Sequence, residues 1–194
     1  MQAEPGEVRL GDEVTVTARL TVACSEEPVP IHMVLVLDGT LYPASEEQRG
    51  FAHRVVDTLD LPAHPRLRVG VVEMGGTPTA RCGLTSDLGE VKACIDGIGT
   101  GPSGPRIDLG IEEGLRLLLR ARADFPDTGD LAHEVMILVS DANTAAGCPP
   151  ILQAANHVKS LGTLLISTCV GDDCNSACMR QVAPSPRYYF EAGD

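Results

Sequence analysis

The sequence predicts a doubly wound α/β fold, in which a mainly parallel, Rossmann-like sheet carries helices on both faces. Residues 31–37 and 134–140 are continuous apolar runs, too short for helices and typical of strands buried on both faces of a parallel sheet. From residue 31 onward, strand-like and helix-like segments alternate, which favours such a sheet. Both apolar runs are closely followed by an aspartate, Asp38 or Asp141, at the sheet edge where α/β proteins place their ligands.

A different pattern precedes this region. Residues 7–24 alternate between apolar and polar side chains, which predicts half-buried antiparallel strands of an Ig-like kind. Residues 25–30 contain two prolines and two glutamates and are interpreted as a linker. We therefore divide the chain into an N-terminal β segment with its linker, 1–30, and an α/β domain, 31–194.

The elements expected in the α/β domain follow from residue periodicity. The strands are predicted at 31–37, 67–74, 134–140, 163–170 and 187–191, with one antiparallel edge strand at 77–84 after the turn at Gly75 and Gly76. The helices are predicted near 44–59, 87–96, 107–122, 149–161 and 173–183.

Composition limits the classes of partner. The 194 residues are 43% hydrophobic and carry a net charge of −12, so nucleic acid and anionic membrane surfaces would be repelled. No run of about 18 apolar residues exists, so no membrane insertion is expected. An enzymatic role is not expected either, because the glycines of 99–104 are followed by Pro105 and Arg106 where a phosphate loop needs Lys and Ser or Thr. No Gly-x-Ser-x-Gly nucleophile motif occurs.

Seven cysteines suggest structural disulfides and hence a secreted or cell-surface protein, whereas reduced cysteines would fit the cytoplasm. We predict a disulfide between Cys82, on the edge strand, and Cys94, on the short helix that follows it. Four further cysteines should lie together at the carboxyl end of the sheet. They can form two disulfides in three different ways, and the sequence does not distinguish between them. These four are Cys148, Cys169, Cys174 and Cys178. Cys24 would remain unpaired.

Three loop segments together resemble a von Willebrand factor type A (vWA) domain of the bacterial surface-protein kind. They are Asp38-Gly-Thr40, the stretch 104–111 that opens the long helix, and Val-Ser-Asp141. The resemblance covers residues 31–191 and implies a non-catalytic adhesion or interaction module that binds a protein ligand. It also implies one further helix after the last strand, so we expect this chain to lack that helix and to expose apolar surface that favours self-association.

The resemblance further implies a metal-ion-dependent adhesion site, here in degenerate form. Asp38, Thr40 and Asp141 match its oxygen ligands, but Tyr42 and Pro105 fall where a Ser and a Thr are expected. One divalent cation (Mg²⁺, Mn²⁺ or Ca²⁺) or none is expected. The loop residues expected to contact a ligand are Gly39, Tyr42, Ser103, Pro105, Arg106 and Asn143.

An alternative interpretation is a structural or assembly domain that has lost metal binding. In that case Asp38 and Asp141 would serve as hydrogen-bond acceptors for backbone amides beside the strand ends.

Overall fold

The computed structural model describes residues 29–40, 45–99, 104–125, 132–171 and 173–192. Its strands are β1 (Ile31–Asp38), β2 (Leu67–Met74), β3 (Thr79–Thr85), β4 (His133–Ser140), β5 (Leu164–Val170) and β6 (Tyr189–Ala192). Its α-helices are α1 (Ser45–Thr58), α2 (Leu88–Asp96), α3 (Ile107–Asp124), α4 (Cys148–Ser160) and α5 (Ser176–Val182). The predicted β segment at 7–24 lies outside the described residues.

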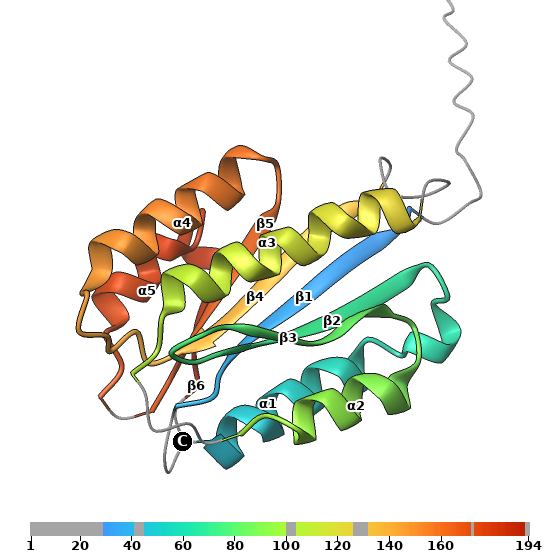
Figure 1. Cartoon of the computed structure of the whole chain (residues 1–194), viewed down its shortest axis with the longest axis horizontal. Helices are drawn as coiled ribbons and strands as arrows, with labels where there is room; N and C mark the ends of the chain where they lie inside the picture. The colour runs from blue at the N-terminus through green and yellow to red at the C-terminus, as the bar shows by residue number, and fades with distance from the viewer. Residues whose placement is uncertain (1–28, 41–44, 100–103, 126–131, 172, 193–194) are drawn as a thin grey trace, which may run out of the picture.

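The six strands form one sheet in the order β3-β2-β1-β4-β5-β6. All neighbouring pairs are parallel except β2 and β3, which are antiparallel and place β3 at the edge. The predicted fold class is therefore confirmed, with β1 and β4 side by side at the centre. Because β1 and β4 are neighbours, the loops that follow them meet at the same edge of the sheet (Figure 1).

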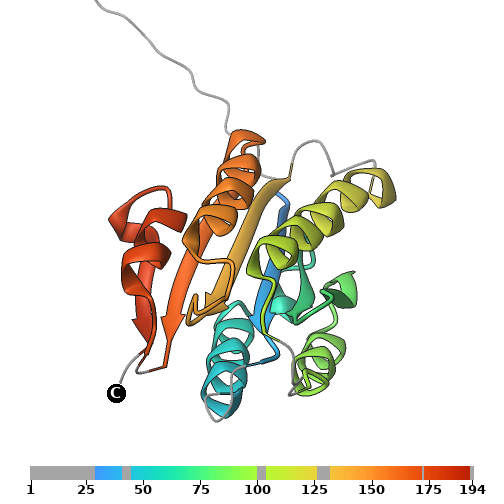
Figure 2. The same ribbon diagram turned by 60° about the vertical axis from the view of Figure 1, so that its left-hand side comes forward.

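Helices cover both faces of the sheet (Figure 2). On one face α3, α4 and α5 pack against side chains such as Val36, Met136 and Leu165, and on the other α1 and α2 pack against Leu35, Val71 and their neighbours. Both cores are aliphatic, as expected for a chain in which aromatic residues make up only 3%. None of the helices in the described parts of the chain is long and apolar enough to cross a membrane.

Helix α3 approaches the sheet unusually closely at two glycines. A Cβ atom placed on Gly110 would lie 2.3 Å from Cγ of Met74, and one on Gly114 would lie 2.9 Å from Cε of Met136. These distances are well inside van der Waals contact, so both positions need glycine for the helix to lie where it does.

Two disulfides form among the four cysteines whose pairing was open. Cys148–Cys178 joins the start of α4 to α5, and Cys169–Cys174 joins the end of β5 to the turn before α5.

The predicted Cys82–Cys94 disulfide is wrong for this structure, in which both residues are free thiols. The two thiols do interact, as the predicted positions on β3 and α2 require, but the Cys94 thiol donates to the carbonyl of Arg81 at 3.6 Å. Burial, followed by the hydrogen bond with Cys94, raises the pKa of the Cys82 thiol. Because the thiolate is the reactive form, this environment keeps Cys82 unreactive.

Candidate functional site

The candidate site lies at the carboxyl edge of the sheet, where β1 and β4 end. Asp38 is the last residue of β1 and is fully buried. The hydroxyl of Ser140, the last residue of β4, donates to Oδ2 of Asp38 at 2.9 Å. The two central strands are thus joined at their ends by a side-chain hydrogen bond, as their parallel register allows.

The loop after β1 folds back onto the Asp38 carboxylate. The backbone amide and the hydroxyl of Thr40 both donate to Oδ1 of Asp38, at 2.9 and 2.7 Å. Gln48 of α1 fixes the Asp38 backbone from the other side, because its side-chain amide accepts from the Asp38 N–H at 2.5 Å and donates to its carbonyl at 2.6 Å. The carboxylate is therefore held by the loop after β1 and by β4, and the Asp38 backbone is held by α1.

The Asp38 carboxylate retains limited capacity for a further ligand. A carboxylate has about four lone-pair sites, two on each oxygen. Both sites on Oδ1 are used by Thr40 and one on Oδ2 by Ser140. Among the described residues, no donor occupies the remaining acceptor site on Oδ2.

Electrostatics at this edge disfavour two ionised carboxylates without a cation. Burial raises the pKa of Asp38, and the nearby charge of Asp141 adds to the effect. The hydrogen bonds from Thr40 and Ser140 lower the pKa but do not reverse the shift. A bound cation would offset both the desolvation and the repulsion.

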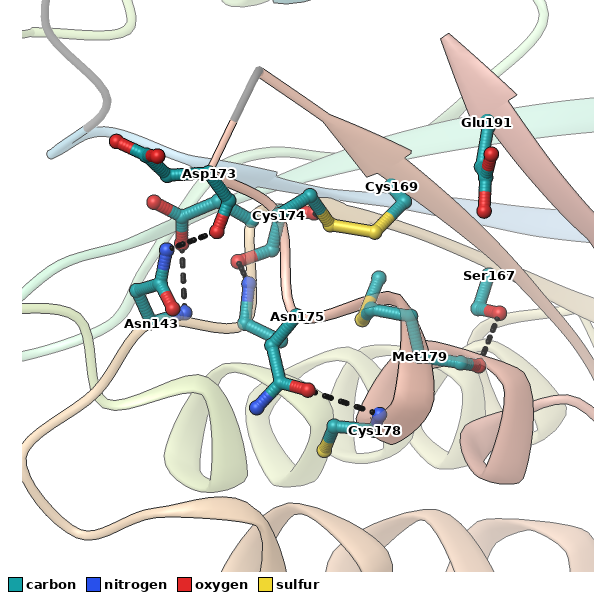
Figure 3. The surroundings of a disulfide bond; sticks show 12 residues. Asn143, Ser167, Cys169, Asp173, Cys174, Asn175, Cys178, Met179 and Glu191 are labelled. Carbon is teal, nitrogen blue, oxygen red and sulfur yellow. Dashed lines mark hydrogen bonds between the residues drawn. A yellow bond between two sulfur atoms is a disulfide. The ribbon is translucent and has the colours of Figure 1, made fainter.

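The loop after β4 carries the second aspartate. Oδ1 of Asp141 accepts from the amide of Asn143 at 2.8 Å, and the side-chain amide of Asn143 donates to the carbonyl of Asp173 at 2.7 Å (Figure 3). Ala142, between them, has a positive φ of 56°, an uncommon backbone conformation for a residue other than glycine. The predicted site residues Asp141 and Asn143 thus belong to a single tight turn.

The loop before α3 contributes no side-chain oxygen from its described part. Pro105 is buried, and the Arg106 amide donates to the carbonyl of Gly75 at 3.1 Å. The Arg106 guanidinium makes a bidentate ion pair with Asp108 at 3.0 and 2.7 Å, which lowers the pKa of the Asp108 carboxyl. Tyr42 and Ser103, which the sequence also suggested, lie outside the described residues.

Sequence reasoning missed Glu73, near the end of β2. If Gly39 carried a Cβ atom, that atom would lie 2.5 Å from Oε1 of Glu73, so this carboxylate lies directly against the first loop. Glu73 forms an ion pair with Arg81 of β3. The available signal was the acidic side chain itself, one residue before the carboxyl end of a mainly apolar strand.

The donor set at this edge consists of oxygen atoms, which hard divalent cations prefer. Asp38, Thr40 and Asp141 supply two carboxylates and one hydroxyl. Within the described ranges there is no group of three or more His, Cys, Asp or Glu residues placed to hold a metal ion. The described residues therefore do not form a site closed by protein groups, and a cation at this edge would have to keep several of its water ligands.

The sequence matches no protein-family model and no curated protein. The fold matches proximal thread matrix protein 1 from the mussel byssus, in a structure whose MIDAS motif is occupied by zinc, with a TM-score of 0.68 and 17% identity over 86% of this chain and 44% of that chain. It also matches manganese-loaded TRAP protein from Plasmodium vivax, with a TM-score of 0.68 and 15% identity over 84% of this chain and 68% of that chain.

A third match is the pilus tip protein Mfa5 from Porphyromonas gingivalis, with a TM-score of 0.69 and 12% identity over 85% of this chain and 47% of that chain. The structures that match are vWA-domain proteins, and this chain has the vWA fold. It spans less than half the length of the mussel and Porphyromonas chains.

Proposed function

We propose that this chain is a non-catalytic protein-binding module, of the adhesion or interaction kind, from a secreted or cell-surface protein. The fold is shared with a byssus matrix protein and a pilus tip protein, which supports an adhesive or interaction role. The two disulfides support an oxidising, extracellular location. The proposal includes a degenerate divalent-cation site formed by Asp38, Thr40 and Asp141.

The observation that carries this proposal is the state of Asp38. Its carboxylate is fully buried, lies within electrostatic reach of Asp141, and has an acceptor site on Oδ2 that none of the described residues uses. A buried carboxylate with no compensating cation is costly, and proteins usually pair such a group. A hydrated Mg²⁺, Mn²⁺ or Ca²⁺ ion would supply that pairing.

The cation would serve as the contact point for the partner. Because Asp38, Thr40 and Asp141 supply few ligands, the ion would retain open positions, and an acidic side chain of a partner protein could take one of them. The loop residues that the sequence predicts to touch a ligand would add direct contacts. These are Gly39, Tyr42, Ser103, Pro105, Arg106 and Asn143. Of these, Arg106 and Asn143 are exposed.

One observation favours a second candidate, a structural or assembly domain without metal. Pro105 stands where the resemblance places a ligating Thr, and Asp38 already accepts three hydrogen bonds from the protein. In that case the aspartates would only connect the loops to the strand ends.

Thermal unfolding in the presence of Mg²⁺, Mn²⁺ or Ca²⁺ distinguishes the two candidates. A ligand that binds only the folded state at 100 times its Kd stabilises it by about 2.7 kcal/mol, which should raise Tm by roughly 5–11 °C for a chain of this size. Asp38→Ala should abolish that rise. The matched control is Asp57→Asn in α1, where Asp57 pairs with Lys92, and it should preserve the rise. No rise in the wild type with any of the three ions would favour the structural role, and a rise that persists in Asp38→Ala would place the metal elsewhere.

A further inference from the structure

The Cys169–Cys174 disulfide lies beside the loop that carries Asp141. It closes a sequence separation of only five residues, between the end of β5 and the turn before α5. Cys169 is buried and Cys174 is half-buried, so a reagent in solution reaches the sulfur of Cys174 more readily. The loop of residues 141–143 (the aspartate loop) and this disulfide come from different parts of the chain. They meet because β4 and β5 are parallel neighbours.

Three contacts join the two segments (Figure 3). The Asn175 amide donates to the carbonyl of Asp141 at 2.7 Å, and the Asn143 side chain donates to the carbonyl of Asp173 at 2.7 Å. The Cys174 sulfur lies 3.7 Å from the carbonyl oxygen of Ser140. Within a disulfide this sulfur carries no hydrogen, so the third contact is one of packing.

Through these contacts, residues 173–175 restrain the aspartate loop. The backbone of Asp141 is fixed by Asn175, and Asn175 also caps α5, since its side chain accepts from the Cys178 amide at 3.2 Å. The disulfide limits the positions that residues 173–175 can take, and therefore limits those of Asp141. The strained backbone of Ala142 makes such external support necessary, because an unsupported turn would relax toward a more common conformation.

We infer that the Cys169–Cys174 disulfide is a positioning element for Asp141 and Asn143, and that its reduction loosens the candidate binding loop. The chemical step is thiol–disulfide exchange with a small dithiol. One thiolate of the dithiol attacks the Cys174 sulfur and displaces Cys169 as a thiolate, which takes up a proton. The second thiol of the reagent then displaces Cys174 and closes the reagent's own disulfide. The protein gains two thiols and the dithiol loses two hydrogens.

The other disulfide provides the matched control. Cys148–Cys178 lies at the same end of the molecule and also joins a half-buried cysteine to a buried one. It connects α4 to α5, whereas Cys169–Cys174 closes the segment that bonds to Asp141. Opening the control disulfide should therefore affect the stability of the whole domain more than the local order of the aspartate loop.

Native-state amide hydrogen exchange tests the inference directly. In Cys169→Ala/Cys174→Ala the amides of Asn143 and Asn175 should exchange at least about tenfold faster than in the wild type. The amides of β1 and β4 should accelerate only by the factor that the variant's loss of global stability, measured by urea unfolding, requires. In Cys148→Ala/Cys178→Ala the same two amides should stay near wild-type rates. Unchanged rates in the first variant, or equal acceleration in both, would overturn the inference.

If the first variant does not fold, the wild type can be treated with limiting dithiothreitol and alkylated with iodoacetamide. Peptide mapping then identifies molecules in which only the Cys169–Cys174 disulfide is opened. Faster exchange of the Asn143 and Asn175 amides in these molecules would support the inference, and unchanged rates would overturn it.

The consequence for binding rests on the proposed function and is measured separately, with Mn²⁺ alone as the probe. If Mn²⁺ raises Tm in the wild type, the rise should be smaller in Cys169→Ala/Cys174→Ala, and an undiminished rise would count against the positioning role. If none of Mg²⁺, Mn²⁺ and Ca²⁺ raises the Tm of the wild type, the cation proposal fails, and the exchange rates alone decide the role of the disulfide.

Discussion

Gly110→Ala should destabilise the domain, although alanine is the better helix-forming residue. Gly110 lies in the second turn of α3, where its Cα faces the side chain of Met74 on β2. The added methyl group would lie 2.3 Å from Cγ, 2.8 Å from Sδ and 3.4 Å from Cβ of Met74. Cγ and Cβ are close to the backbone of a fully buried residue, so rotation of the distal side chain cannot relieve the overlap.

The magnitude follows from two opposing effects. Replacing a helical glycine by alanine gains about 1 kcal/mol, and overpacking a tight core costs about 1–3 kcal/mol. With an overlap this deep we expect the upper part of that range, and hence a net loss of about 1–2 kcal/mol.

Gly50→Ala in α1 is the matched control, because its Cβ atom would meet only Nη1 of Arg54, at 3.5 Å. That variant should gain up to about 1 kcal/mol, so the two alanine variants should differ in Tm by roughly 2–12 °C.

The assay is thermal and urea unfolding of both variants, with a double variant that also carries Met74→Ala. Removing the Met74 side chain creates the missing space, so Gly110→Ala should become neutral or stabilising in that background. A Gly110→Ala protein as stable as Gly50→Ala would show that α3 does not lie this close to β2, and the packing argument would be refuted.

Three further predictions concern the disulfides and two buried titratable groups. The disulfides close sequence separations of 30 and five residues, so removing Cys148–Cys178 should lower the free energy of unfolding by about 3.6 kcal/mol and removing Cys169–Cys174 by about 2 kcal/mol. Urea unfolding of the paired alanine variants shows which of the two disulfides stabilises the domain more. The pKa of Asp38 is raised above 3.8 by burial, so its ionisation in metal-free protein costs stability as pH rises. The free energy of unfolding of Asp38→Asn should therefore rise relative to that of the wild type between about pH 4 and pH 7, and a difference that does not change with pH would contradict this. The pKa of His32 is lowered from 6.5 by burial and by Arg68, so the wild type should lose stability relative to His32→Leu as pH falls below about 6.5, which thermal unfolding at pH 7 and pH 5 would show.

Much of the fold followed from local sequence patterns. Apolar runs of strand length, separated by amphipathic helical segments, are sufficient to specify a parallel sheet, since each strand must be buried on both faces. The turn at Gly75 and Gly76 predicted an antiparallel edge strand at 77–84, which the structure has at 79–85. The resemblance to vWA domains implied that 31–37 and 134–140 are central, as the strand order confirms. The position of Asp38 at the mouth of the site was predicted for the same reason, because strand ends meet at one edge.

Sequence alone identified Asp38, Thr40 and Asp141 as a candidate site, but tertiary structure decided what surrounds them. Gln48 and Glu73 approach the first loop from α1 and β2, and nothing in their local sequence marks them as its neighbours. The disulfide pairing also depended on three-dimensional distance, since several pairings fit the same cysteine spacing. For Cys82 and Cys94 the predicted positions on β3 and α2 brought the two residues near each other, yet both are free thiols, and burial raises the pKa of Cys82. Periodicity reports which face of an element is buried, whereas which side chains meet, and in what chemical state, depends on how the elements pack.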